Sequence, residues 1–326
     1  MKPAPNINGV WEIADNAAVA NCPAPAVSVV ISLYNYAAYI AGCLDSVRAS
    51  KTDGMPGGFE VMVVDDYSKD NSVAVVEKYM VASPLPIRLV KKLANSGLAD
   101  TRNIGLLLAR APLVFILDAD NTIRPNCLLE HYHALAHSDY AMAFGIINRF
   151  DHDTGTSVGT MSQYEWEVPR LVAGPCIDAM SMVRRETVQS VGGYSVEYGQ
   201  NLPQGWEDYD LWMKLALAGH SGKFIPQILS DYRVHSQSML QQLLPHQGRL
   251  AAHFTRKFLP FVAKYNDLPV LFGFSRRDLI ALCAEGRGLQ FSLQKRPARF
   301  LHYVLGKRLC RSLCKRLVEI YCWLHP

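Results

Sequence analysis

A regular alternation of short apolar runs with amphipathic stretches constrains the fold of this 326-residue chain more than any other feature. Apolar runs rich in β-branched residues indicate strands that are buried on both faces. The expected strands lie at 27–33, 59–64, 86–90 and 113–117, and the expected helices at about 39–47, 70–81 and 98–110. This alternation predicts an α/β fold, in which a mostly parallel sheet of the Rossmann-like kind is flanked by helices.

The rest of the chain divides around this α/β region. Residues 1–25 are rich in Ala, Pro and Asn and predict an N-terminal extension with a short helix around Trp11. Residues 26–245 form the predicted main domain, whose second half is less regular, and residues 246–326 predict a basic, helical C-terminal region. In the second half we expect strands at 140–147 and 223–229, a polar loop at 151–159 and a helix at 208–218.

Composition excludes several classes of protein. With 49% hydrophobic and 19% charged residues, the chain can bury a large core and is not disordered as a whole. The net charge of +4 is too small to argue for a nucleic-acid partner. No apolar run approaches the ~20 residues that span a bilayer. The eight cysteines form no C-x-x-C pair, and the N-terminus lacks the apolar core of a secretory signal, so a cytoplasmic protein with reduced cysteines is expected.

Polar residues follow three of the predicted strands where each strand ends. Ser32 and Tyr34 close the first, Asp66 follows the second, and Asp118 and Asp120 follow the fourth. Ligands of open parallel sheets bind beyond the carboxyl ends of the strands. Two acidic clusters at that edge would repel each other unless a cation or a donor-rich ligand lies between them. The D-x-D pair suits Mg²⁺ or Mn²⁺, which take one or two carboxylates together with phosphate oxygens; the alternative is that it only caps a loop.

Three further residues are candidates only in combination with the motifs already described. Arg102 lies in a helix that precedes the D-x-D strand, so it can reach the same edge and pair with carboxylates or a phosphate, or it can remain solvated. Asp208 begins a helix, where the dipole favours its ionised form, although a plain N-cap would look the same. His235 follows a strand, and a lone histidine is more often structural than a ligand.

Six blocks of the chain, taken in order, resemble family 2 of the glycosyltransferases, which have the GT-A fold. They are VSVVISLYN, FEVMVVDDYSKDNS, NSGLADTRNIGLLLARAPLVFILDADN, VRRETVQSVGGYSVEY, WEDYDLWMKLALAGH and YRVHSQSM, between Val27 and Met239. Each block alone is a weak signal, but six in the family's order are specific. The resemblance implies a nucleotide-sugar-binding half at 26–125 and an acceptor-side half at 126–245.

The resemblance assigns the donor nucleotide to residues of the first half. Ser32, Tyr34 and Asp66 match positions that hold the base and ribose. Arg102 matches an arginine on the nucleotide side, and Asp118 also matches a nucleotide-binding position. The expected donor is a nucleotide-diphosphate sugar, with uracil as the expected base.

The metal site implied by the resemblance consists of Asp118, Asp120 and His235, and it would hold Mg²⁺ or Mn²⁺. Asp120 is the expected direct ligand, and His235 matches a position that can reach the metal or the diphosphate. Two residues depart from the family pattern. Asn121 replaces the usual third acid and removes one negative charge, and Tyr67 replaces the usual glycine of the turn beside the base.

The resemblance implies that Asp208 is the catalytic base, with Glu207 and Trp206 beside it on the acceptor side. The expected reaction is inverting sugar transfer to the hydroxyl of a saccharide or lipid-linked acceptor, in the synthesis of cell-surface polysaccharide or glycolipid. The alternative is a sugar-nucleotide-binding scaffold with weak or no catalysis, for which Asn121 is the only hint. Nucleotidyltransferases and dinucleotide-dependent oxidoreductases would need a glycine-rich loop after the first strand, where this chain reads YNYAAY.

The C-terminal segment from residue 287 interleaves Lys and Arg with apolar residues. Such a segment can lie on an anionic membrane surface, which would place the protein at the inner face of the membrane. It can equally form a helical cap whose charges are solvated.

Overall fold

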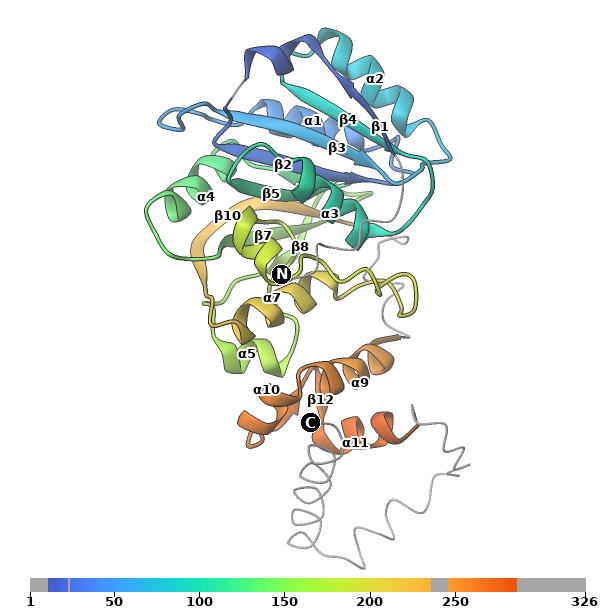
Figure 1. Cartoon of the computed structure of the whole chain (residues 1–326), viewed down its shortest axis with the longest axis vertical. Helices are drawn as coiled ribbons and strands as arrows, with labels where there is room; N and C mark the ends of the chain where they lie inside the picture. Colours follow the sequence, from blue (N-terminus) through green and yellow to red (C-terminus); the bar gives the residue numbers. More distant parts are fainter. Residues whose placement is uncertain (1–10, 23, 236–245, 286–326) are drawn as a thin grey trace, which may run out of the picture.

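The computed structural model describes residues 11–22, 24–235 and 246–285 (Figure 1). A ten-stranded sheet forms its centre, in the order β1-β4-β3-β2-β5-β9-β7-β10-β6, with β8 paired to β7. The strands are β1 (Trp11–Asp15), β2 (Val27–Leu33), β3 (Phe59–Asp65), β4 (Ile87–Lys92), β5 (Leu113–Asp118), β6 (Thr122–Ile123), β7 (Met142–Asp151), β8 (Ser157–Met161), β9 (Ser181–Arg184) and β10 (Gly222–Val234).

The predicted parallel sheet is confirmed for β4, β3, β2 and β5, which run in the same direction. Every residue of β2 and β3 is buried, as their mostly apolar sequences predict. Farther along, β9 is inserted antiparallel between β5 and β7, and β10 runs parallel to β7. The sheet is therefore mixed, and its second half is built from strands that pair across long stretches of sequence.

Helices cover both faces of the sheet (Figure 1). On one face α1, α2 and α4 bury Leu44, Val76 and Leu128 against the sheet. On the other face α3, α7 and α9 belong to a second core cluster with the sheet. The helices are α1 (Ile40–Arg48), α2 (Ser72–Ala82), α3 (Leu98–Leu108), α4 (Cys127–Ala136), α5 (Val168–Ala173), α6 (Arg185–Ser190), α7 (Glu207–Leu217), α9 (Gln247–Lys257), α10 (Leu259–Lys264) and α11 (Arg276–Glu285), and η1 (Ala17–Asn21) is a 3₁₀ turn.

The expected helix around Trp11 is wrong, because Trp11–Asp15 forms the edge strand β1. This strand pairs antiparallel with β4, from Trp11 opposite Lys92 to Asp15 opposite Arg88. The Arg88 guanidinium donates two hydrogen bonds to Asp15, at 2.8 and 2.7 Å. Pairing with an otherwise open sheet edge satisfies the backbone groups of both strands, which outweighs a weak local preference for helix.

Part of the expected loop at 151–159 is also a strand. Residues Ser157–Met161 form β8, which pairs antiparallel with the extended end of β7 although most of it is exposed. Its exposed, polar sequence carries no strand period, so only pairing with β7 explains it.

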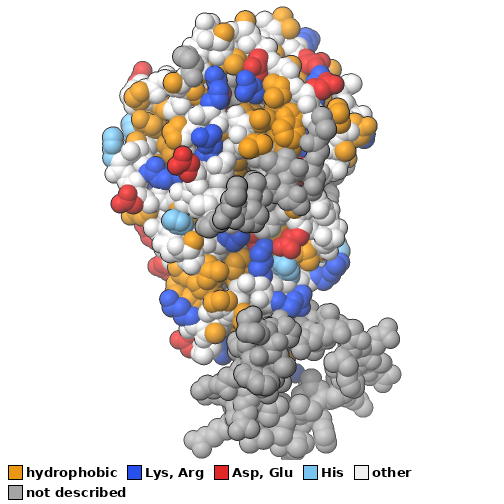
Figure 2. Space-filling view, in the orientation of Figure 1, with side chains coloured by type: hydrophobic (Ala, Val, Ile, Leu, Met, Phe, Trp, Pro, Cys, Tyr) orange, Lys and Arg blue, Asp and Glu red, His pale blue; other side chains and the backbone are white. Residues whose placement is uncertain are grey.

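The described part of the C-terminal region, residues 246–285, contains the helices α9, α10 and α11 and a short hairpin of β11 (Val270–Leu271) and β12 (Phe274–Ser275). The basic segment 287–326 lies outside the described residues. Among the described helices, none combines the length and apolar character needed to cross a bilayer. On the face shown in Figure 2, Lys, Arg, Asp and Glu side chains are interspersed with apolar ones.

Candidate active site

The carboxyl ends of three neighbouring strands place the first candidates at one edge of the sheet. In the register of the sheet Ser32 of β2 lies opposite Asp118 of β5 and Val64 of β3, and Leu33 lies opposite Asp65. Because Asp66 follows directly after β3, the acidic ends of β3 and β5 flank the end of β2. The sheet therefore gathers these residues, as the alternation of strands and helices predicts.

Arg102 joins the two acidic motifs of the chain. Its guanidinium donates from Nη2 to Asp118 Oδ1 and from Nη1 to Glu207 Oε1, both at 2.9 Å. The arginine is 1% exposed, so both contacts form in a low-dielectric environment, where charge-assisted hydrogen bonds are strong. Arg102 lies on α3 and thus connects the D-x-D strand to the start of α7. Glu207, its partner there, is 105 residues farther along the chain.

Asp208 lies in the first turn of α7, next to Glu207. Its Oδ1 accepts the backbone N–H of Tyr209 at 2.7 Å, and the carboxyl is half-buried. Burial, reinforced by Glu207 and Asp178, raises the pKa of Asp208 well above its usual range, and Arg102 opposes the rise. A carboxylate whose pKa is raised is a stronger base when ionised, as a general base requires.

Trp206, the residue before α7, has left-handed backbone angles (φ 65°, ψ 9°). Its indole is buried and packs edge-on against Tyr209 and Phe254, with ring centroids 5.4 and 5.0 Å away. A non-glycine residue in this conformation is held there by its surroundings. The structure therefore places the Trp206 ring in the core between α7 and α9, where it sets the start of α7.

Asp120 and His235 meet on the other side of the D-x-D. His235 Nε2 lies 3.2 Å from Asp120 Oδ2, and the ring of Tyr39 stacks on His235 at 5.8 Å between centroids. Burial, together with the charge of Asp118, raises the pKa of Asp120, although His235 opposes the rise. Tyr36 also hydrogen-bonds to Asp120, and its own pKa is raised by burial and by the two carboxylates.

The surroundings of Asp120 would suit a divalent cation. A buried carboxylate beside a second carboxylate, here Asp118, is destabilised until a positive charge compensates it. Within the described part of the chain, however, no three His, Cys, Asp or Glu side chains are arranged to hold a metal ion. Asp118 instead directs Oδ1 to Arg102. The expected set of Asp118, Asp120 and His235 is thus present as a close pair with Asp118 engaged elsewhere.

Asn121, the departure from the family pattern, has a structural role. Its Oδ1 accepts the backbone N–H of Arg233 at 2.9 Å, and the residue is 1% exposed. Arg233 also donates from Nε to the backbone oxygen of Asp120 at 3.0 Å. These bonds fasten the end of β10 to the D-x-D turn and so hold His235 beside Asp120.

The residues expected to bind the nucleotide differ in whether their polar groups already have hydrogen-bond partners. Asp66 is buried, and its two oxygens accept the backbone N–H groups of Ser96 and Gly97 at 2.9 Å and the ammonium of Lys92 at 2.7 Å. It therefore anchors the turn that leads into α3. Ser32 Oγ is buried and has no hydrogen-bond partner within the described chain, whereas Tyr34 is 42% exposed at the rim.

Sequence reasoning missed Asp178, Tyr36 and Tyr232. Burial, with Asp118 as the next cause, raises the pKa of Asp178 to about 6. Burial and the charges of Asp178, Asp120 and Asp118 raise the pKa of Tyr232. Asp178 precedes β9, whose insertion beside β5 brings it to the site. No local pattern marks it, so the topology had to be known first.

Comparisons with known proteins show the family of this chain. The model of glycosyl transferase family 2 matches residues 28–192, just over half of the chain. The glycosyltransferase GlyG of Streptococcus pneumoniae is 24% identical over 129 residues, which are 40% of this chain and 41% of that protein. The poly(ribitol-phosphate) β-N-acetylglucosaminyltransferase TarS of Staphylococcus aureus is 35% identical over 102 residues, 31% of this chain and 17% of that one. The chain spans about two fifths of the length of the first two curated relatives that it matches.

Two solved structures share the architecture. The S. aureus TarS fragment 1–349 in complex with UDP-GlcNAc superimposes with a TM-score of 0.58 at 20% identity, over 83% of this chain and 77% of that one. The mannosyltransferase PcManGT of Pyrobaculum calidifontis, in complex with GDP-Man and Mn²⁺, gives 0.58 at 19% identity, over 96% and 89%. The fold is that of the GT-A class. Within that class, the chain belongs to glycosyl transferase family 2.

Proposed function

We propose that the protein is an inverting glycosyltransferase that moves a sugar from a nucleotide-diphosphate donor, with uridine as the expected nucleoside, to an acceptor hydroxyl. The bridge of Arg102 between Asp118 and Glu207 carries the proposal, because it brings the D-x-D to the start of α7, where Asp208 lies. An acceptor bound beside Asp208 could lose its proton to that carboxylate while its oxygen attacks the anomeric carbon. Attack from the face opposite the leaving diphosphate inverts the configuration.

Asp208 is suited to this role by its environment. Burial and the neighbouring acids raise its pKa, which increases its affinity for the acceptor proton, and Arg102 limits the rise. Glu207 contributes through its contact with Arg102 rather than through a free oxygen facing solvent, since it is buried. We propose that Asp208 is the base and that Glu207 and Trp206 shape the acceptor side around it.

On the donor side we propose that Ser32, Tyr34 and Asp66 hold the base and ribose, and that Arg102 and Asp118 border the diphosphate. The unpartnered Ser32 hydroxyl and the exposed Tyr34 ring are available to a ligand. Asp120 and His235, with Asp118, would hold Mg²⁺ or Mn²⁺, which would supply Lewis-acid stabilisation of the charge on the leaving diphosphate. The donor half is residues 26–125 and the acceptor half is residues 126–245.

The acceptor class is proposed from the relatives. TarS, by its name, acts on poly(ribitol-phosphate), and a relative in Rhizobium meliloti is named for succinoglycan biosynthesis. We propose a saccharide or lipid-linked acceptor in cell-surface polysaccharide or glycolipid synthesis. Such an acceptor would favour a cytoplasmic enzyme at the inner face of the membrane, contacted through residues 287–326. Flotation of the full chain and of a chain ending at residue 286 with anionic liposomes tests this contact, and equal flotation of the two would contradict it.

The function is tested by incubating the protein with UDP-GlcNAc, UDP-glucose, UDP-galactose and GDP-mannose and measuring release of the nucleoside diphosphate. Slow hydrolysis of one donor, absent in Asp208→Asn, is the expected result. Binding of a nucleoside diphosphate without turnover of any donor, with or without saccharide acceptors, would favour the scaffold alternative. Asn121, the only sequence hint for that alternative, has a structural role, because its Oδ1 accepts the backbone N–H of Arg233.

A further inference from the structure

A second cluster of charged side chains lies behind α7, apart from the residues around Asp208. Its centre is Asp210, which is fully buried. Because residues two apart on a helix point in nearly opposite directions, Asp208 and Asp210 face different surroundings. Asp210 Oδ1 accepts from Lys257 Nζ at 2.6 Å and from the Tyr198 hydroxyl at 3.1 Å, and Oδ2 accepts from the Ser195 hydroxyl at 2.6 Å.

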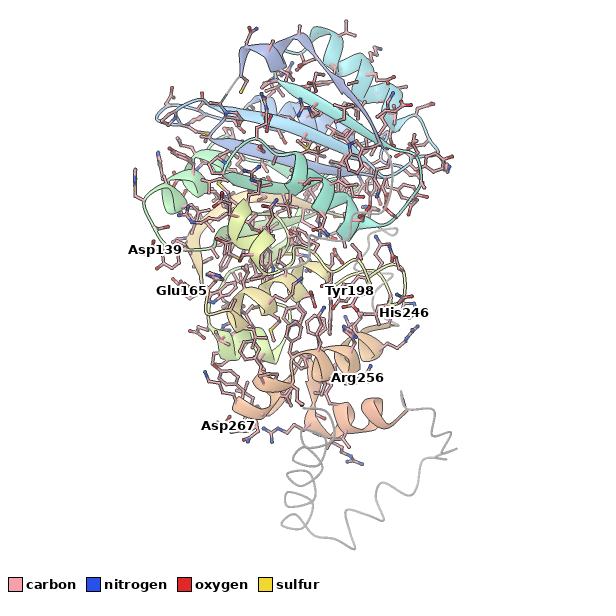
Figure 3. All side chains as sticks on the ribbon, in the orientation of Figure 1. Asp139, Glu165, Tyr198, His246, Arg256 and Asp267 are labelled. Carbon is pink, nitrogen blue, oxygen red and sulfur yellow. The ribbon has the colours of Figure 1, made fainter. Side chains whose placement is uncertain are left out.

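Lys257 reaches this cluster from another part of the chain. It is the last residue of α9, in the C-terminal region, and its ammonium also contacts Glu197 Oε1 at 2.7 Å and Ser195 Oγ at 3.0 Å. The three donors of a lysine ammonium are thus matched by acceptors on α7 and on the segment 195–197. Figure 3 labels Tyr198, the residue after Glu197, and Arg256, the residue before Lys257 on α9.

The cluster is balanced in charge. Lys214, one turn after Asp210 on α7, lies 3.3 Å from Asp210 Oδ2, so two lysines face Asp210 and Glu197. Burial alone would raise the pKa of Asp210, but Lys214 and Lys257 outweigh it, and the pKa is lowered. His253, also on α9, lies 3.2 Å from Glu197 Oε1. Removal of one member therefore leaves a buried charge without compensation.

The segment that carries Ser195 and Glu197 also holds the helix of Arg102. The amide of Asn103 donates to the backbone oxygen of Tyr194 and accepts the backbone N–H of Tyr194, both at 2.8 Å. Asn103 is the residue after Arg102. The segment 194–197 therefore connects α3, α7 and α9, which lie far apart in the sequence.

We propose that Lys257 is a positioning residue for catalysis. Through Asp210 and the segment 194–197 it fixes the first turn of α7, in which the Asp210 N–H donates to Trp206 O at 2.8 Å, and so fixes Asp208 relative to Arg102. The C-terminal helix α9 then completes the active site without contributing a group that touches substrate. The catalytic part of this inference rests on the proposed function, whereas the ordering of α7 does not.

Amide hydrogen exchange on the full chain tests the ordering of α7 directly. Lys257→Met should speed exchange in residues 206–212 on the order of 10-fold, because the first turn loses its side-chain anchor, and Lys257→Arg should restore most of the protection. Lys264→Met is the matched control, since that lysine of α10 faces only the Tyr265 ring in the contacts described. Faster exchange confined to 247–257, with 206–212 unchanged, would overturn the proposal.

Turnover of the donor identified by the sugar-nucleotide panel tests the catalytic consequence. We expect Lys257→Met to lower kcat on the order of 10-fold to 100-fold while the donor KM and the affinity for UDP change little. The double variant Asp210→Asn/Lys257→Met keeps the charge balance, so it should regain thermal stability yet stay slow. Wild-type kcat in a stable double variant would overturn the proposal. No turnover of any donor by the unchanged protein would instead contradict the proposed function, and the exchange experiment would still decide the role of Lys257.

Discussion

Arg102 and Glu207, which are 105 residues apart in the sequence, form a buried ion pair with 2.9 Å between Nη1 and Oε1. Since Nη2 of the same guanidinium holds Asp118, one positive charge compensates two carboxylates that would otherwise repel each other. The D-x-D motif and the start of α7 are therefore coupled electrostatically. This arrangement makes Arg102 a structural requirement of the site as well as a candidate for the diphosphate.

Arg102→Met should destabilise the protein strongly. It leaves the buried Glu207 and the partly exposed Asp118 without their partner. Breaking a buried ion pair in this way costs about 3–5 kcal/mol of the free energy of unfolding. Urea denaturation followed by circular dichroism measures the change. The control is Arg170→Met, whose pair with Glu167 is exposed and should contribute about 0–1 kcal/mol. Equal losses of unfolding free energy in the two variants would show that the ion pairs of Arg102 contribute no more to stability than an exposed pair.

Asp208→Asn should retain donor binding and lose turnover by ~10²-fold or more, because an amide cannot take the proton from the hydroxyl of the acceptor. In the unchanged enzyme kcat/KM should fall as pH drops through the raised pKa of Asp208, since protonation removes the base. Calorimetry with UDP and steady-state kinetics across pH check both statements. Turnover near the wild-type level in the variant would assign the base to another residue, with Asp178 as the first to examine.

The first half of the fold could be predicted from the sequence because its signals are local. Residues 27–33 are mostly apolar and rich in β-branched side chains, so the expected strand and the observed β2 coincide. The gathering of Ser32, Asp66 and Asp118 at one edge then follows from the geometry of parallel strands. The strand at Trp11–Asp15 was not predictable in this way, because it forms only by pairing with β4.

The same distinction applies to the site. The motif around Asp208 is visible in the sequence, but the position of Asp178 depends on β9 entering the sheet antiparallel beside β5. The burial of the Trp206 ring depends on α9, which supplies Phe254 from the C-terminal region. Long-range packing of this kind leaves no periodic signal in the residues concerned.

Asp120→Ala should abolish the metal dependence of nucleotide binding. The buried Asp120 carboxylate, beside Asp118 and His235, is the proposed ligand of the divalent cation. Calorimetric titration of UDP with and without Mn²⁺ measures the effect, and Asp153→Ala, an exposed acid in the turn after β7, is the control. A gain in UDP affinity from Mn²⁺ that persists in Asp120→Ala would exclude this residue as the ligand.

Asp178 should make the protein less stable as pH rises. Its pKa is about 6 in the folded chain against 3.8 for an ordinary aspartate, mainly because burial disfavours the charged form. A carboxyl whose pKa is raised by folding contributes stability below about pH 4, and that contribution is lost as pH rises through about 6. The difference of about two units corresponds to at most about 3 kcal/mol.

Asp178→Asn removes this titration, so its free energy of unfolding relative to the unchanged protein should improve between pH 4 and pH 7. Urea denaturation at a series of pH values measures the difference. Asp139→Asn, at an exposed loop position, provides the comparison for loss of one acidic charge (Figure 3). The difference in free energy of unfolding between Asp178→Asn and wild type could instead stay constant across this range. Asp178 would then be ionised at pH 4 as readily as an exposed aspartate, which means that the charge on Arg102 fully offsets its burial.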